Sequence, residues 1–97
     1  LGWKVTIQTG TFKKGRNDLS LIVLSRAGRP LENATVLLTI SRPATRQYDR
    51  IYPTGQAGND RFTADIDLPV FGYWDLCAEV RQGKDRFDHC ERIYARE

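Results

Sequence analysis

The chain has 97 residues, the length of one domain, and its 40% hydrophobic content suits one modest core. Fifteen basic and twelve acidic residues give a formal net charge of +3, and the two signs are mixed along the chain. This mixing argues against the basic stripe of a nucleic-acid-binding protein. No run of 18 apolar residues is present to span a membrane. We therefore expect one soluble domain over residues 1–97 that does not bind nucleic acid.

Alternating side chains predict three strands in the N-terminal half. Residues 3–8 alternate apolar and polar side chains, which is typical of a half-buried strand. A turn at 13–15 leads to residues 19–24, which are apolar on both faces and predict a central strand. Gly28 and Pro30 predict a turn at 26–30, and a third strand is expected at 35–41.

The C-terminal half predicts a loop followed by four more strands. Residues 42–49 contain Pro43 and show no periodic pattern, so a loop is expected there. Pro53 is expected to end a short edge strand at 49–52. Turns at 56–60 and 69–72 then separate the remaining predicted strands, which are 62–68, 74–80 and a last strand through Phe87, His89 and Ile93.

Seven short strands with regular turn signals predict an all-β immunoglobulin-like β-sandwich. No window carries the i, i+3, i+4, i+7 apolar repeat of an amphipathic helix. Each strand has one apolar face, and two sheets must press these faces together to remove them from water. Trp3, Phe62, Trp74 and Phe87 are the large side chains expected in that core.

Cys77 and Cys90 are the only cysteines, and they fall in a predicted hairpin with a turn at 82–85. If Arg81 pairs with Arg86 across this turn, Cys77 falls directly opposite Cys90. Cα atoms of directly opposed residues lie roughly 4.5–5.5 Å apart, which is within the disulfide range. This register therefore makes Cys77 and Cys90 candidates for a disulfide.

The same register leaves a difficulty that keeps other states of the cysteines open. It opposes Glu79 to Asp88 and Arg81 to Arg86, and like charges directly opposite are unfavourable. A neighbouring register would relieve these pairs and move the cysteines to a diagonal. The favoured state is a disulfide, which would imply an oxidising compartment. Two free thiols, or a thiolate pair that binds Cu(I), are the alternatives.

The remaining candidate residues do not form a catalytic or metal site. His89 is the only histidine, and it points to the opposite strand face from its neighbour Cys90, so the two cannot form a dyad. Asp65 and Asp67 share an outward face and are expected to remain solvated rather than act as an acid pair. The sequence has no Gly-rich phosphate loop, no zinc-ligand spacing and no methionine. We expect no catalysis, metal or cofactor.

A series of short motifs, taken in order, resembles the FixH (also CcoH) family over nearly the whole chain. The most distinctive part is the combination of Ser-Arg-Pro, Leu-Pro…Gly-x-Trp-Asp-Leu and Arg-Phe. The motifs are Gly2-Trp3, Gly28-Arg29-Pro30-Leu31, Ser41-Arg42-Pro43-Ala44, Arg61-Phe62-Thr63-Ala64, Leu68-Pro69, Gly72-Tyr73-Trp74-Asp75-Leu76 and Gly83-Lys84-Asp85-Arg86-Phe87.

The resemblance implies a periplasmic domain on the bacterial inner membrane. A membrane-spanning helix is expected just before Leu1, which fits a chain that starts without Met. Such proteins are encoded beside a copper-transporting P-type ATPase and assist biogenesis of cbb3-type cytochrome c oxidase. The oxidase subunits and the ATPase are therefore the expected partners, and the family brings no catalytic residues. The cysteine pair is not part of the family pattern.

A partner-binding surface is expected in the predicted loop, because Arg and Tyr are enriched at interface hot spots. Its candidates are Arg42, Pro43, Arg46, Tyr48 and Arg50. The alternative is an ordinary solvated loop. If these residues bind a partner, replacing Arg42 and Arg46 with Ala is expected to leave folding intact and to reduce oxidase assembly.

Two other functions remain open. The first is a periplasmic copper-delivery domain with Cys77 and Cys90 as ligands. The second is a generic carbohydrate- or surface-binding sandwich, which would need an exposed aromatic platform. Tyr48, Tyr52 and Tyr73 are too separated in the sequence to establish such a platform.

Overall fold

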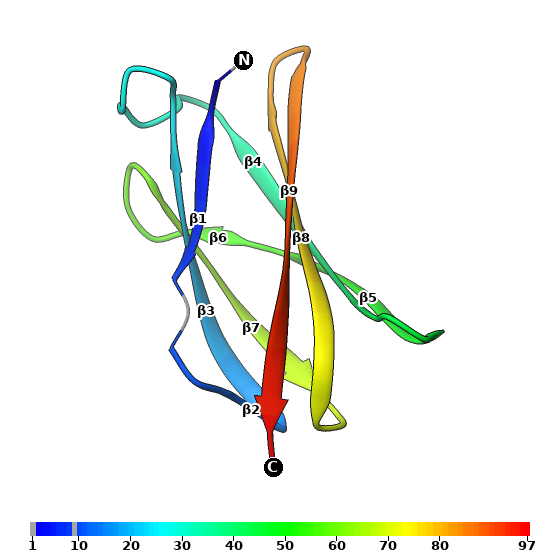
Figure 1. Ribbon diagram of the computed structural model, residues 1–97. Coiled ribbons are helices and arrows are strands. Elements are labelled where there is room, and N and C mark those ends of the chain that lie inside the picture. The colour runs from blue at the N-terminus through cyan, green and yellow to red at the C-terminus, as the bar shows by residue number, and fades with distance from the viewer. Residues whose placement is uncertain (1, 9) are drawn as a thin grey trace.

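The computed structural model describes residues 2–8 and 10–97, and every regular element in these residues is a β-strand. Nine strands form two sheets that pack as a sandwich (Figure 1). The predicted all-β sandwich is confirmed. The two strands beyond the predicted seven, β2 and β6, have two residues each and are too short for a hydrophobic period to reveal. This part of the chain contains no helix able to cross a membrane.

The first sheet has four antiparallel strands in the order β1-β3-β7-β6. The predicted central strand is confirmed, because β3 lies between β1 and β7. The bounds are Lys4–Gln8 for β1, Gly15–Leu24 for β3, Gly55–Gln56 for β6 and Arg61–Leu68 for β7.

The second sheet has five strands in the order β2-β9-β8-β4-β5. All neighbours are antiparallel except β2, which runs parallel to the end of β9. The bounds are Phe12–Lys13 for β2, Thr35–Arg42 for β4, Thr45–Pro53 for β5, Gly72–Gln82 for β8 and Asp85–Arg96 for β9.

One hydrophobic core fills the space between the sheets, and its members follow the two-residue period of the strands. Trp74 is the largest fully buried side chain, and its indole Nε1 donates a hydrogen bond to the carbonyl of Val70 at 3.0 Å. Trp3 and Phe62 are also buried, and Phe87 packs against the core while partly exposed. The large side chains predicted for the core therefore lie in it or against it.

The predicted loop at 42–49 is wrong over most of its length. Only Pro43 and Ala44 form a turn, and β5 begins at Thr45. This hairpin projects from the body of the molecule (Figure 1). An edge strand pairs with one neighbour only, and most β5 side chains face solvent. Such a strand needs no alternation of apolar residues, so periodicity could not detect it.

Asn17 is a buried polar residue that fixes the turn before β3. Its side-chain Oδ1 accepts a hydrogen bond from the backbone N–H of Lys13 at 3.0 Å. Its Nδ2 donates to the carbonyls of Lys13 and Gly15, at 2.8 and 3.0 Å. These bonds satisfy the polar groups that the turn would otherwise leave unpaired beside the core.

Candidate functional site

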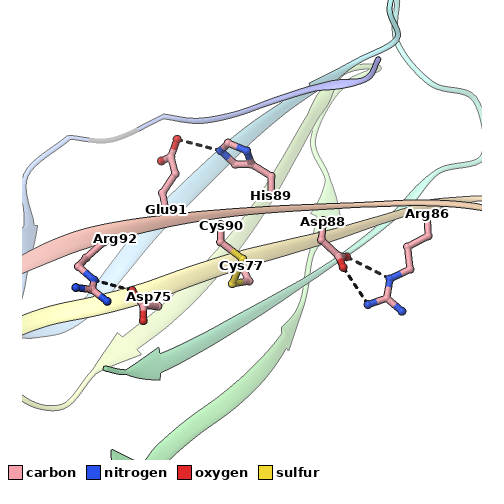
Figure 2. Close-up of a disulfide and its surroundings, with 8 residues drawn as sticks. All are labelled: Asp75, Cys77, Arg86, Asp88, His89, Cys90, Glu91 and Arg92. Carbon is pink, nitrogen blue, oxygen red and sulfur yellow. Dashed lines mark hydrogen bonds and ion pairs between the residues drawn. A yellow bond between two sulfur atoms is a disulfide. The ribbon is translucent and has the colours of Figure 1, made fainter. Parts of the chain in front are cut away.

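The face of the five-stranded sheet that looks away from the core, here called the outer face, carries a disulfide. Cys77 of β8 and Cys90 of β9 are directly opposite each other, their sulfur atoms are bonded, and their Cα atoms lie 4.0 Å apart (Figure 2). The strand pairing around them has Arg81 opposite Arg86, which is the register predicted from the sequence. In the structure neither cysteine is a free thiol.

The like-charge pairs that this register creates are neutralised by their neighbours. Glu79 lies opposite Asp88, but the Arg86 guanidinium contacts both carboxylates, at 3.0 and 3.1 Å. Arg81 in turn contacts Glu79 at 3.1 Å. The hydrogen bond to Asp88, followed by the charges of Asp88 and Glu79, raises the pKa of Arg86 above its ordinary value. The two carboxylates and the two guanidinium groups together thus carry no net charge.

A second pair of contacts lies on the other side of the disulfide. The Arg92 Nε donates to the Asp75 carboxylate at 2.9 Å, and this hydrogen bond raises the pKa of Arg92 (Figure 2). Beyond it, the exposed rings of Tyr73 and Tyr94 meet edge to face, with their centroids 5.0 Å apart. Charge pairs therefore join β8 to β9 on both sides of the cysteines.

Two apolar side chains stand beside the disulfide on the outer face. Leu37 of β4 is 40% exposed and Ile51 of β5 is 68% exposed. Both line a shallow hollow whose other residues include Thr39, Cys77 and Cys90. The prediction from sequence missed Leu37 and Ile51. A signal was present, because Leu37-Leu38 breaks the alternation of β4 and Ile51 is apolar in a strand that otherwise faces solvent.

Arg42, one of the predicted partner-binding residues, is half-buried and bonded to the body of the fold. Its Nη1 donates to the carbonyls of Phe71 and Tyr73, at 3.0 and 3.1 Å. The guanidinium also lies over the Trp74 ring, 5.2 Å from the centroid, within the range of a cation–π contact. The expectation that replacing Arg42 leaves folding intact therefore has to be revised.

The other predicted partner-binding residues lie on the projecting hairpin, and the structure separates them into two groups. Pro43, Arg46 and Arg50 are exposed. Tyr48 is half-buried and packs edge to face on Trp74, with ring centroids 6.0 Å apart. Only Pro43, Arg46 and Arg50 therefore offer most of their surface to a partner.

The histidine and the paired aspartates have ordinary surroundings. His89 lies on the opposite side of β9 from Cys90, and its Nε2 is 3.1 Å from the Glu91 carboxylate (Figure 2). Asp65 pairs with Arg16 at 3.3 Å. The backbone N–H of Asp67 donates to the Tyr52 hydroxyl at 3.2 Å. Within residues 2–8 and 10–97, no three His, Cys, Asp or Glu side chains are grouped so that they could hold a metal ion.

Comparison with known proteins gives one match. Residues 1–94 match the family model described as FixH. No curated protein and no solved structure matches the chain. The match covers nearly all of the chain, including the disulfide and the projecting hairpin.

Proposed function

Because the chain belongs to the FixH family, whose members are accessory proteins not known as enzymes, we propose that it is a non-enzymatic interaction domain. In this proposal it assists assembly of cbb3-type cytochrome c oxidase alongside a copper-transporting P-type ATPase. It works on the periplasmic side of the bacterial inner membrane, anchored by a helix that precedes Leu1. The family match over residues 1–94 is the observation that carries the proposal.

The projecting β4–β5 hairpin is the proposed contact with the oxidase subunits or the ATPase. Arg46 and Arg50 are exposed there, and Arg42 and Tyr48 fix the base of the hairpin on Trp74. A guanidinium on a well-anchored support forms hydrogen bonds with little loss of conformational freedom. This combination supports Arg46 and Arg50 as the contact residues.

A pull-down with the native N-terminal segment restored tests the proposal. We expect the full-length protein to recover oxidase subunits or the copper ATPase from membranes. An Arg46→Ala/Arg50→Ala variant is expected to recover roughly fivefold less, which corresponds to a loss of about 1 kcal/mol of binding free energy. The matched control is Arg29→Ala/Arg61→Ala, which removes two exposed arginines from other parts of the surface. Equal recovery by both variants would exclude the hairpin, and no recovery by the unchanged protein would exclude the partners.

Copper delivery through Cys77 and Cys90 is the second candidate function. The observation that favours it is the position of both cysteines on the outer face, directly opposite each other, with Cys90 exposed and Cys77 half-buried. Copper binding needs thiolates, so the disulfide would first have to be reduced. A thiol assay on untreated protein tests it. Two reactive thiols that bind one Cu(I) would support delivery, and no reactive thiol would support the bridged accessory domain.

A further inference from the structure

We propose that the Cys77–Cys90 disulfide is a thiol-exchange site, which a dithiol reduces while the domain stays folded. This inference concerns the chemistry of the cysteines, and it does not depend on the accessory role proposed above. It rests on three observations: the exposure of the sulfur-bearing residues, the pairing that holds β8 to β9 without the bridge, and the surface beside it.

The disulfide is within reach of a nucleophile in solution. Cys90 is exposed and Cys77 is half-buried. β8 lies inside the sheet between β9 and β4, whereas β2 pairs with β9 only opposite Ala95 and Arg96. Among the described residues, β9 is therefore the edge strand at the level of Cys90. A thiolate can approach Cys90 from this edge and meets less obstruction there than at Cys77.

The hairpin does not need the bridge to keep its register. β8 and β9 are paired over eleven residue pairs, from Gly72 opposite Ala95 to Gln82 opposite Asp85. On the outer face, ion pairs join the two strands on both sides of the cysteines, through Arg92 and through Arg86. On the inner face, Trp74 and its neighbours in β8 are buried in the core. Reduction therefore breaks one link among many, and the two thiols remain side by side.

The reaction is a two-step exchange with a dithiol. A thiolate of the dithiol attacks Sγ of Cys90, the bond between the two protein sulfurs breaks, and Cys77 leaves as a thiolate that takes a proton from water. The second thiolate of the dithiol then attacks the dithiol sulfur that is bonded to Cys90, and Cys90 leaves as a thiolate that also takes a proton from water. Two electrons and two protons pass from the dithiol to the protein, and the dithiol becomes a cyclic disulfide.

The surroundings of the disulfide are suited to a dithiol carried on an apolar surface. Leu37 and Ile51 line the same hollow as both cysteines, and contact with a partner would remove their exposed apolar area from water. The acidic side chains at the edge of the hollow are paired with Arg86, so a thiolate does not meet unbalanced negative charge there. A small dithiol and a protein dithiol would reduce the disulfide by the same steps. Only the protein would gain from covering Leu37 and Ile51, so these two side chains distinguish the two sources.

The first experiment measures reduction in the folded state. Oxidised protein is treated with dithiothreitol in native buffer and alkylated, and the modified thiols are counted by mass spectrometry. We expect two modified cysteines with an unchanged far-ultraviolet circular dichroism spectrum, at a rate close to that measured in urea. A Cys77→Ser/Cys90→Ser variant is expected to show the same spectrum without modification. Reduction only under denaturing conditions, or loss of the β spectrum on reduction, would overturn the proposal.

The second experiment locates the point of attack. Glutathione, a single thiol, forms a mixed disulfide, and rapid alkylation of the released cysteine traps it before that thiolate can displace the glutathione or a second glutathione can complete the reduction. Trypsin then separates the two cysteines, because Cys77 falls in the fragment 62–81 and Cys90 in the fragment 87–92. We expect glutathione mainly on 87–92. Adducts mainly on 62–81 would contradict attack at the edge strand.

The third experiment identifies the source of the dithiol. The probe is a peptide that carries a Cys-x-x-Cys dithiol between apolar residues, compared with dithiothreitol. If the source is a protein, Leu37→Ser/Ile51→Ser should slow reduction by the peptide and leave dithiothreitol unaffected. Phe71→Ser is the control, since Phe71 is exposed but lies outside the hollow. Equal rates for peptide and dithiothreitol in every variant would support a small dithiol.

Discussion

At the residue scale, Arg42 closes one end of the core where β4 turns into β5. Its guanidinium covers the Trp74 ring and donates to the carbonyls of Phe71 and Tyr73. The Phe71 carbonyl immediately precedes β8 and the Tyr73 carbonyl belongs to it, so one side chain ties the projecting hairpin to the neighbouring strand. Arginine suits this position because it offers several donors in one plane together with a flat surface for an aromatic ring.

Replacing Arg42 with Ala is expected to lower the free energy of unfolding by about 1–3 kcal/mol, since two charge-assisted hydrogen bonds and a cation–π contact are lost. Urea denaturation followed by tryptophan fluorescence measures the change. Arg46→Ala, on the exposed part of the same hairpin, should stay within about 0.5 kcal/mol of the unchanged protein. Equal stability of the two variants would show that Arg42 does not hold the fold.

Gly72, at the start of β8, is required both by its backbone and by its neighbour. Its φ is +114°, and a Cβ there would lie 2.9 Å from Nη1 of Arg42. Gly72→Ala should therefore lower stability by about 1–3 kcal/mol through backbone strain, with a further loss from displacing Arg42. The loss should be smaller in an Arg42→Ala background. Gly55→Ala, where the added Cβ meets nothing within 4 Å, is the control in the same denaturation assay.

At the element scale, the β8–β9 hairpin is held by its long pairing and by the disulfide. The bridge spans a sequence separation of 13, and closing a loop of this size stabilises a protein by about 3 kcal/mol in the chain-entropy model. Cys77→Ser/Cys90→Ser should lower the denaturation free energy by about this amount and keep the β spectrum. A variant that fails to fold would show that the bridge, and not the pairing, sets the register.

Arg86 makes the predicted register tolerable by balancing Glu79 and Asp88. In an Arg86→Ala variant these two carboxylates face each other with only Arg81 nearby, so the hairpin should lose stability. The loss should be larger at low ionic strength than at high, because salt screens the remaining repulsion. Thermal denaturation at several salt concentrations measures it. A loss that does not change with salt would assign the effect of Arg86 to packing.

At the scale of the whole molecule, protection is expected to be greatest where strands have neighbours on both sides. β3 lies between β1 and β7, and β8 lies between β9 and β4. The pairing of β4 with β5 is interrupted between Ile40, which pairs with Arg50, and Arg42, which pairs with Thr45. In amide hydrogen exchange, β3 and β8 should exchange most slowly and residues 45–49 among the fastest. Uniform protection across β5 would contradict this arrangement.

The sequence predicted the strands that have a buried face better than the strand that faces solvent. Strands with one buried face, such as 62–68 and 74–80, were predicted within two residues of their ends. The edge strand β5 was largely missed, because its side chains face solvent and carry no pattern. Asn17 was also missed, since its three hydrogen bonds depend on how the backbone turns before β3.

The sequence by itself determined the all-β class and the core faces, because alternation and turn spacing are local properties of the chain. Its motifs carried the resemblance to the family, and it favoured the register that opposes Cys77 to Cys90 without excluding the neighbouring one. Only the tertiary structure decided that Arg42 supports the core and that Leu37 and Ile51 stand beside the disulfide. These side chains acquire their surroundings from strands distant in the sequence. The pairing of β4 with β5 and β8, and the packing of Trp74 beneath Arg42, create those contacts.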